Sequence, residues 1–427
     1  MRYHFAKQLP LFLSLVIGSL FLGCSNSEGV DQEIIANWNI AEDDATPLSA
    51  KLDYLPLDDS EYPYAGIPRI VIETENHREI KDRETEIPAR LQIWGEHAPE
   101  SEVMELTIRG RGNTSWGYPK KPYAIKFEKK QAFLGMPKSK KWVMLANYRD
   151  RTLIRNAVAF EIARQTSQEW VPQGRFAEIF LNKKFIGNYY ICEKIEIKKE
   201  KLDLDSNSFL LEFDTYFDET NKFRSAYRNF PINIKQPKDL SDEKFNHIRN
   251  YIDSIECSLY GECSNNDYKF LLDLKSLASF WIVQEVTQNP EVKMPKSVYA
   301  YKDTILKFGP VWDFDWQTFT TRPKGLIAKN ALWLQKIREK REFQEIIQSE
   351  WAQSEKKLQS LTTFIDSLAN YTQLSNERNF NLWGLKLTNG LAGDEEEDFS
   401  SAIQMMKQSL LNRLEELHMF WASDPNF

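Results

Sequence analysis

The hydrophobic pattern of the chain changes once, after residue 214, and this change constrains the fold more than any other feature. Between residues 69 and 214, short apolar runs follow the two-residue period of β-strands. From residue 242 onward, apolar residues recur at helical spacing over longer stretches. A strand-rich part followed by a helix-rich part predicts an α+β fold with two lobes around a cleft.

The expected elements can be placed along the chain from these patterns. Strands are expected at 69–73, 89–94, 102–109, 122–127, 141–146, 176–181, 185–193 and 209–214. One helix at 151–164, with Asp150 as its N-cap, interrupts them. Further helices are expected at 242–257, 274–287, 343–368 and 399–421, with a short β pair at 297–301 and 306–308. The predicted domains are a β-rich lobe at 67–210 and an α-rich lobe at 211–427.

The N-terminus has the pattern of an export signal. Arg2 and Lys7 precede an apolar run that ends at Leu22, and Cys24 follows after one glycine. This pattern is similar to a bacterial lipoprotein signal peptide at 1–23, with Cys24 as the lipidated residue. The alternative is an uncleaved helical anchor with an unmodified cysteine. The acidic segment 24–66 is then a tether, and the expected location is the cell envelope, with the protein lipid-anchored in the outer membrane and facing either the periplasm or the surface.

Charge and cysteine content exclude two classes of function. The formal net charge is −7, which gives no support for bulk nucleic-acid binding, because that needs a basic face. The five histidines are scattered and no CxxC pair occurs, so a zinc site is not expected. Cys257 and Cys263 are close enough in sequence to form a local disulfide, although two free thiols are the alternative. Cys192 lies in an apolar run and is expected in the core.

Two basic motifs are candidates for holding an anion. Arg109 and Arg111 flank a glycine in a turn between strands, which suits either a phosphate-holding loop or an ordinary hairpin with surface arginines. Lys126 lies within an apolar strand, where a lysine is costly to bury without an anionic partner. Glu161 on the following helix is the expected partner, as in the strand-lysine and helix-glutamate pair of protein kinases. A lysine that extends to solvent and an exposed Glu161 are the alternative.

Two acidic motifs are candidates for metal binding and proton transfer. Asp313 and Asp315 alternate with aromatic residues, and paired carboxylates suit hard cations such as Mg²⁺. Asn289 and Glu291 follow the predicted helix 274–287, where Asn289 is a candidate metal ligand and Glu291 a candidate proton acceptor. The alternatives are turn-forming aspartates and a helix end stopped by proline.

Taken together, these motifs resemble the CotH kinase family, named after a spore-coat protein. The resembling strings, in chain order, are Ile108-Arg-Gly-Arg-Gly-Asn-Thr-Ser-Trp116, Lys121-Pro-Tyr-Ala-Ile-Lys126, Lys141-Trp-Val-Met-Leu-Ala-Asn147, Asp150-Arg-Thr-Leu-Ile-Arg-Asn156, Gly187-Asn-Tyr-Tyr-Ile-Cys-Glu-Lys194 and Gly309-Pro-Val-Trp-Asp-Phe-Asp315. The resemblance covers about residues 100 to 320. It implies a two-lobed protein-kinase-like fold and phosphoryl transfer from ATP, with Mg²⁺ or Mn²⁺, to protein hydroxyls.

The resemblance also implies a role for each matching residue. Lys126 would bind phosphate, Asp313 would hold the metal with help from Asp315, and Asn289 matches the asparagine of the catalytic loop. Glu291 stands where family members commonly carry the catalytic aspartate. Glutamate is one methylene longer, so the proton acceptor would be displaced. Two other functions stay open. They are a pseudokinase-like envelope protein that binds a partner protein or a glycan, and a glycoside hydrolase that uses Glu291 with Asp313 or Asp315.

Overall fold

The computed structural model describes residues 60–261, 263, 268–384 and 390–422. The predicted signal peptide, Cys24 and most of the predicted tether lie outside the described residues. Within the described part of the chain, no helix combines the length and the apolar character that crossing a membrane requires.

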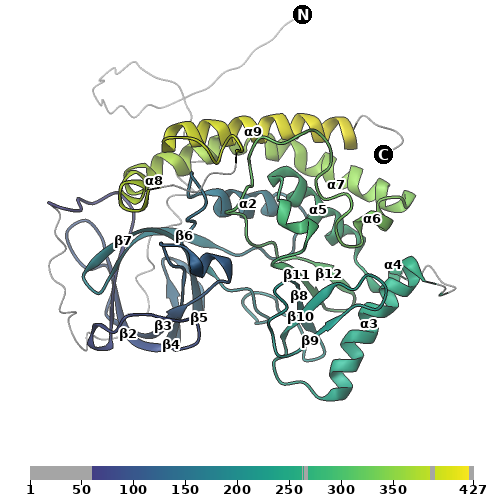
Figure 1. Cartoon of the computed structure of the whole chain (residues 1–427), viewed down its shortest axis with the longest axis horizontal. Coiled ribbons are helices and arrows are strands. Elements are labelled where there is room, and N and C mark those ends of the chain that lie inside the picture. Colours follow the sequence, from purple (N-terminus) through teal and green to yellow (C-terminus); the bar gives the residue numbers. More distant parts are fainter. Residues whose placement is uncertain (1–59, 262, 264–267, 385–389, 423–427) are drawn as a thin grey trace, which may run out of the picture. The chain divides into compact units, whose positions relative to one another are not determined.

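The strand-rich part closes into a seven-stranded barrel, which Figure 1 shows in purple and blue. The strands are β1 (Arg69–Thr74), β2 (Ile87–Trp94), β3 (Met104–Gly110), β4 (Tyr123–Phe133), β5 (Met136–Leu145), β6 (Gly174–Leu181) and β7 (Lys184–Glu193). Their order around the barrel is β1-β2-β3-β4-β5-β7-β6, and β1 closes the ring by pairing with β6 in parallel. The other neighbouring pairs are antiparallel.

Alternating side chains explain why these strands enclose a core. On β4 the alternate residues Tyr123, Ile125 and Phe127 are buried. Ile125 lies opposite Ile108 of β3 and opposite Trp142 of β5, so apolar side chains of three strands meet inside the barrel. Each of these three residues is at most 2% exposed. The two-residue period of the sequence therefore fills the barrel interior.

A second, five-stranded sheet has the order β12-β11-β8-β10-β9. Its strands are β8 (Phe209–Phe213), β9 (Lys222–Arg224), β10 (Pro231–Gln236), β11 (Val298–Lys302) and β12 (Leu306–Phe308). All of its neighbouring pairs are antiparallel. Because β8 pairs with β11, the sheet joins the end of the strand-rich part to a segment that follows two long helices.

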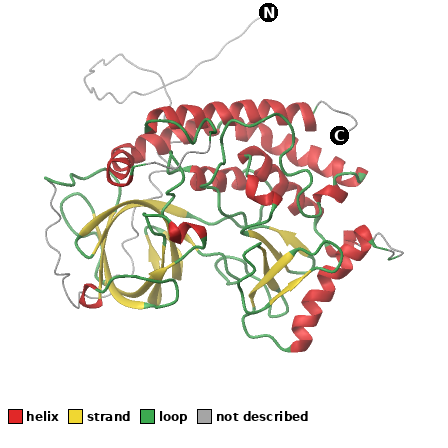
Figure 2. Cartoon of the chain, in the orientation of Figure 1, coloured by secondary structure: helices red, strands yellow, loops and turns green. Residues whose placement is uncertain are grey.

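Helices pack against both sheets, as Figure 2 shows in red. They are α2 (Arg155–Arg164), α3 (Asp242–Tyr260), α4 (Tyr268–Leu271), α5 (Leu274–Thr287), α6 (Leu334–Ile337), α7 (Arg341–Gln359), α8 (Leu361–Trp383) and α9 (Phe399–Trp421). Short 3-10 turns are η1 (Glu75–His77), η2 (Thr114–Gly117) and η3 (Pro290–Lys293). Helix α8 packs on β7 of the barrel, and α5 packs on β12 of the second sheet. Helix α2 contacts both α5 and α8, so it connects the two halves.

The predicted two-lobed protein-kinase-like fold is wrong. Its N-terminal lobe would be an open sheet, whereas the described strands close into a barrel. Its C-terminal lobe would be mainly helical, whereas this half carries most of a five-stranded sheet. The physical reason is that closure depends on the pairing of Ile70 with Ile179, which are far apart in sequence. No local pattern of apolar residues indicates such a pairing.

Two helix boundaries and one crosslink complete the comparison with the sequence. Helix α2 begins at Arg155 and not at Arg151, and Asp150 is not its N-cap, because Leu153 has a φ of 59° that no α-helix contains. The expected helix 343–368 is divided at Ser360 into α7 and α8. The predicted disulfide between Cys257 and Cys263 is confirmed, and Cys192 is buried as expected.

Candidate functional site

A cavity of about 890 Å³ lies between the barrel and the second sheet. Its walls come from the η2 turn, from β4 and β5, from β8 and β10, and from the segment 312–316. Six of the predicted site residues line it, and they are Arg109, Arg111, Lys126, Glu291, Asp313 and Asp315. The structure therefore brings together residues that the sequence separates by up to two hundred positions.

The segment 312–316 contributes Asp313 and Asp315 to this cavity, while Phe314 between them is anchored outside the cavity lining. Phe314 is fully buried, and its ring stands edge-on to the Phe160 ring of α2 with centroids 6.5 Å apart. The backbone N–H of Phe314 donates a hydrogen bond of 2.9 Å to Oδ1 of Asn156. Asp313 has a φ of 69°, in the left-handed region that aspartate tolerates better than most residues.

Glu291 reaches the same cavity from the η3 turn. Oδ1 of Asn289 accepts the backbone N–H of Glu291 at 3.1 Å, which caps the turn and fixes the position of the glutamate. Its side chain is 11% exposed and forms an ion pair of 3.2 Å with Lys296. Burial, followed by the nearby Asp313 carboxylate, raises the pKa of Glu291 to about 7.

The pKa values of Asp313 and Asp315 are also raised above the usual range of aspartate. Burial raises the pKa of Asp313, although the Arg111 guanidinium acts in the opposite direction. Burial raises the pKa of Asp315 well above its usual range, and the carboxylates of Asp313 and Glu291 raise it further. Burial is therefore the main cause of all three shifts, and mutual repulsion adds to it at Glu291 and Asp315.

Arginine and lysine partly balance this acidic group. The guanidinium of Arg111 lies 5.9 Å from the centre of the Trp312 ring. The ammonium of Lys296 lies 5.7 Å from the centre of the Tyr216 ring and equally far from that of Trp316. At the edge of the cavity, the hydroxyl groups of Thr114 and Tyr216 hydrogen-bond and thereby connect the η2 turn to the second sheet.

Three of the predicted site residues, Lys126, Glu161 and Asn289, do not have the contacts or the position in the cavity that the sequence predicts. Lys126 is half-exposed and pairs with Glu86 at 3.2 Å. Glu161 bonds to Arg164 and Gln165 on its own helix, so the predicted pair of Lys126 with Glu161 is replaced by two separate contacts. Neither Glu161 nor Asn289 is among the described residues that line the cavity.

The structure adds two residues that were not singled out in the sequence. Asp214, directly after β8, accepts the backbone N–H groups of Tyr216 and Ser297, and burial with the nearby Glu212 raises its pKa to about 6. Its position at the end of an apolar strand could have marked it. Lys120 is fully buried, donates to the carbonyl of Asn188, and has its pKa lowered well below the usual range by burial. No sequence signal marks Lys120.

The fit of a metal ion depends on the donor set. In the described residues, no group of three or more His, Cys, Asp or Glu side chains is arranged to hold a metal ion. The chemistry of Asp313 and Asp315 nevertheless fits a hard divalent cation, which prefers carboxylate oxygens and keeps water or phosphate in its other positions. The raised pKa values of both groups mark a place where added positive charge is favourable.

The comparison with protein families places the chain in one family. A family model described as CotH kinase protein matches residues 108–417. The chain belongs to the CotH kinase family. The matched region begins in β3 and ends in α9, so it contains every element that contributes Glu291, Asp313 and Asp315 to the cavity. A search of curated proteins found no match.

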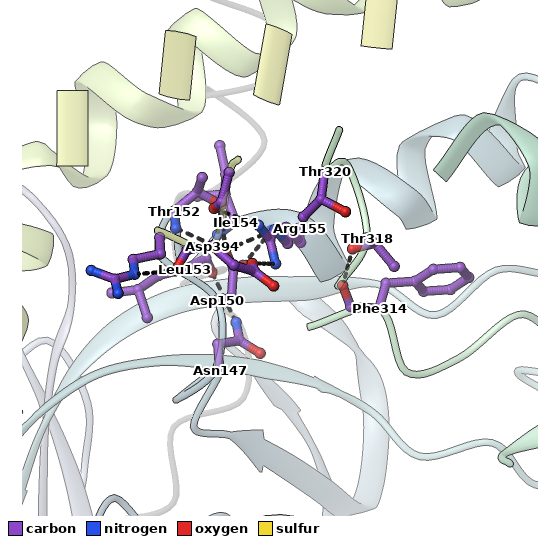
Figure 3. Close-up of polar contacts among 12 residues, drawn as sticks. Asn147, Asp150, Thr152, Leu153, Ile154, Arg155, Phe314, Thr318, Thr320 and Asp394 are labelled. Atoms are coloured by element: carbon purple, nitrogen blue, oxygen red, sulfur yellow. Dashed lines mark hydrogen bonds and ion pairs between the residues drawn. The ribbon is translucent and has the colours of Figure 1, made fainter. Parts of the chain in front are cut away.

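Within the CotH region, a buried polar network lies behind the acidic segment (Figure 3). Arg155 forms ion pairs with Asp150 at 3.3 Å and with Asp394 at 2.6 Å, and all three side chains are at most 5% exposed. The next residue, Asn156, donates to Asn147 at 3.0 Å and accepts from Phe314. The network therefore connects the first turn of α2 to the backbone between the two aspartates.

Proposed function

We propose that this CotH family member is a metal-dependent phosphotransferase that moves a phosphoryl group from ATP to a protein hydroxyl. The observation that carries the proposal is the convergence of Glu291, Asp313 and Asp315 in one cavity beside Arg111. Phosphoryl transfer requires positioned phosphates, a cation and a proton acceptor, and each has a candidate on this wall. Membership of the CotH kinase family supports the same activity.

The residues divide into roles according to their surroundings. Asp313 and Asp315 would hold Mg²⁺ or Mn²⁺, which would neutralise charge on the phosphates. Glu291, with a pKa of about 7, is suited to accept the proton of an attacking hydroxyl. Asn289 caps the turn that carries Glu291, because its Oδ1 is already used by the backbone of that turn. It acts on the site through Glu291.

The phosphate contact falls first to Arg111. It lies close enough to Asp313 to lower the pKa of that aspartate, and it lines the cavity. Arg109 instead donates to the backbone carbonyl of Gly110 at 3.0 Å, which stabilises the turn before η2. Lys126 stands at the cavity edge in its pair with Glu86, so its contribution to phosphate binding is expected to be smaller than that of Arg111.

A labelling experiment tests the activity. The full chain is incubated with radiolabelled ATP and Mg²⁺ or Mn²⁺, and bound nucleotide and label on protein are both measured. Asp313→Asn is expected to abolish transfer, since it removes a metal ligand but keeps a residue that tolerates the backbone conformation. Glu200→Gln is the control that retains transfer, because Glu200 pairs with Lys130 and neither residue lines the cavity. A wild-type chain that binds no nucleotide would overturn the proposal.

The Glu291→Asp variant distinguishes an active kinase from a binding protein that has lost the activity. The shorter side chain restores the residue that family members commonly carry. If the wild type binds nucleotide without transferring label, and Glu291→Asp transfers it, the natural chain is a pseudokinase-like binding protein for a partner protein or a glycan. Transfer by the wild type that falls in Glu291→Gln establishes the glutamate as the proton acceptor.

The proposed place of action is the cell envelope, through a lipid on Cys24, which lies outside the described residues. The supporting observation is the apolar run followed by Gly23 and Cys24. Replacement of Cys24 by serine is expected to release the protein from membranes in a fractionation experiment. Membrane association that survives this replacement would contradict the anchor.

A further inference from the structure

The segment 391–396, between α8 and α9, contacts both flanks of the acidic segment. On one flank, Arg155 donates to the carbonyl of Gly393 at 2.8 Å, and Arg151 donates to the carbonyls of Asp394 at 2.9 Å and Glu396 at 2.6 Å. On the other flank, the N–H of Thr321 donates to the carbonyl of Ala392 at 3.1 Å. The segment therefore holds the start of α2 and the backbone after residue 316 at the same time.

The carboxylate of Asp394 brings this segment into the buried network. The carboxylate of Asp394 pairs with Arg155 at 2.6 Å, and both side chains are at most 5% exposed. Figure 3 shows Asp394 beside Asp150 and Arg155, with Phe314 and Thr318 across from them. The N–H of Arg155 donates to Asp150 at 2.8 Å, so the first turn of α2 is fixed by backbone and side chain together.

The connection from Arg155 to the cavity is short. Asn156 follows Arg155 in α2, and its Oδ1 accepts the N–H of Phe314 at 2.9 Å. Phe314 separates Asp313 from Asp315, so any rotation of its peptide re-aims both carboxylates. Around this peptide the backbone also has positive φ at Asp313, Gln317 and Phe319, and such conformations persist only where the surroundings hold them.

We propose that Asp394 is a positioning residue for Asp313 and Asp315, acting through Arg155 and Asn156 on the peptide of Phe314. Its chemical consequence rests on the proposed function, because the two aspartates are metal ligands only if that function holds. Groups that orient metal ligands commonly contribute about 10- to 100-fold to metal affinity. Asp394 lies far along the chain from the aspartates that it orients.

The Asp394→Asn variant tests this role selectively. It removes the charge that faces Arg155, while Arg155 keeps its pair with Asp150. The backbone contacts of Arg151 and Arg155 to the segment also remain, so the segment stays docked. Arg378→Gln is the matched control, since it breaks another buried ion pair, with Glu178 at 3.2 Å on the barrel, away from the acidic segment.

Hydrogen exchange followed by mass spectrometry gives a measurement that does not depend on metal or activity. In Asp394→Asn, exchange in the peptides that contain residue 314 is expected to rise about tenfold, because the bond from Phe314 to Asn156 opens more often. Arg378→Gln is expected to leave those peptides unchanged. Equal exchange at residue 314 in both variants would overturn the positioning role.

Binding of Mn²⁺ without nucleotide, followed by electron paramagnetic resonance, supplies the second measurement. The dissociation constant is expected to rise at least about tenfold in Asp394→Asn and to stay unchanged in Arg378→Gln. A wild-type chain that binds no Mn²⁺ would refute the metal-ligand role, while hydrogen exchange would still decide whether Asp394 positions the segment.

Asp394→Glu provides the conservative variant. It keeps the charge and is expected to lie between wild type and Asp394→Asn in both measurements. If Asp394→Asn does not fold, Asp394→Glu takes its place, and exchange at residue 314 is expected to rise at least about threefold because the longer side chain displaces Arg155. Exchange equal to that of the wild type would then overturn the positioning role.

Discussion

Two acidic groups are connected through Asn156 and the backbone of Phe314, and neighbouring charges balance them to different degrees. In the network around Arg155, burial raises the pKa of Asp150, and Arg155 and Thr152 act to lower it. In the cavity, burial raises the pKa of Asp315, and the neighbouring carboxylates of Asp313 and Glu291 raise it further. The first group is paired with Arg155 at close range, whereas Arg111 and Lys296 offset the charge of the second group only in part.

This difference separates structural from functional acids more clearly than burial does. A carboxylate with an internal cation and backbone donors stabilises the fold, and its removal leaves an unpaired charge. Carboxylates that repel one another raise the energy of the folded chain, and the cation proposed above would relieve that cost. The following predictions test this distinction, from the largest expected effect to the smallest.

Replacement of Arg155 by methionine is expected to have the largest effect on stability. It leaves Asp150 and Asp394 buried without their cation, at a cost of about 3–5 kcal/mol in the free energy of unfolding. Denaturant titration measures this. Arg341→Met is the control, because its pair with Glu345 is exposed and contributes at most about 0.5 kcal/mol. If Arg155→Met lowers the free energy of unfolding by less than about 1 kcal/mol, the ion pairs of Arg155 do not stabilise the fold.

Replacement of Asp315 by asparagine is expected to change stability in the opposite direction. Without metal, removal of one of three crowded carboxylates relieves repulsion and is expected to raise the free energy of unfolding by about 1 kcal/mol. The same variant is expected to lose Mn²⁺ binding and label transfer. Thermal denaturation with and without Mn²⁺ measures both effects. Destabilisation in metal-free buffer would contradict the comparison.

The pH dependence of the metal-free chain follows from the pKa of Glu291. That pKa is raised from 4.5 to about 7, so the folded state binds this proton more tightly than the unfolded chain does. The resulting stabilisation is complete below about pH 4.5 and is lost as the pH rises through about 7. Glu291→Gln is therefore expected to lose less Tm than wild type between about pH 5 and pH 8. If Tm falls equally in the wild type and in Glu291→Gln, the pKa of Glu291 is not raised by burial and by the nearby carboxylates.

The smallest effect is expected for Lys126→Ala. Lys126 and Glu86 form a half-exposed pair at 3.2 Å, and such pairs contribute about 0–1 kcal/mol. The control is Lys130→Ala on the same strand, whose pair with Glu200 is similarly exposed. Denaturant titration and nucleotide binding are both measured. If Lys126→Ala loses more nucleotide binding than Arg111→Ala does, Lys126 and not Arg111 makes the main phosphate contact.

The sequence predicts the parts of this site that are carried by local patterns. Alternation of acids with aromatics marks Asp313 and Asp315, and a proline after a helix marks Glu291. Contacts between distant segments leave no such pattern. The parallel pairing of β1 with β6 closes the barrel, and the contact of Asp394 with Arg155 joins residues 239 positions apart. The strand-lysine and helix-glutamate pattern predicts a pair of Lys126 with Glu161, yet Glu86, 40 positions from Lys126 in sequence, takes that contact.

The left-handed backbone of Asp313 limits how this site can evolve. At a φ of 69°, asparagine and glycine are the replacements that cost least, whereas β-branched or bulky residues are strained. A relative that does not need this carboxylate is therefore expected to carry asparagine or glycine at position 313. Glutamate, the chemically nearest acid, is less accessible than either. The backbone conformation at position 313 therefore favours substitutions that remove the carboxylate over a substitution by glutamate that would keep it.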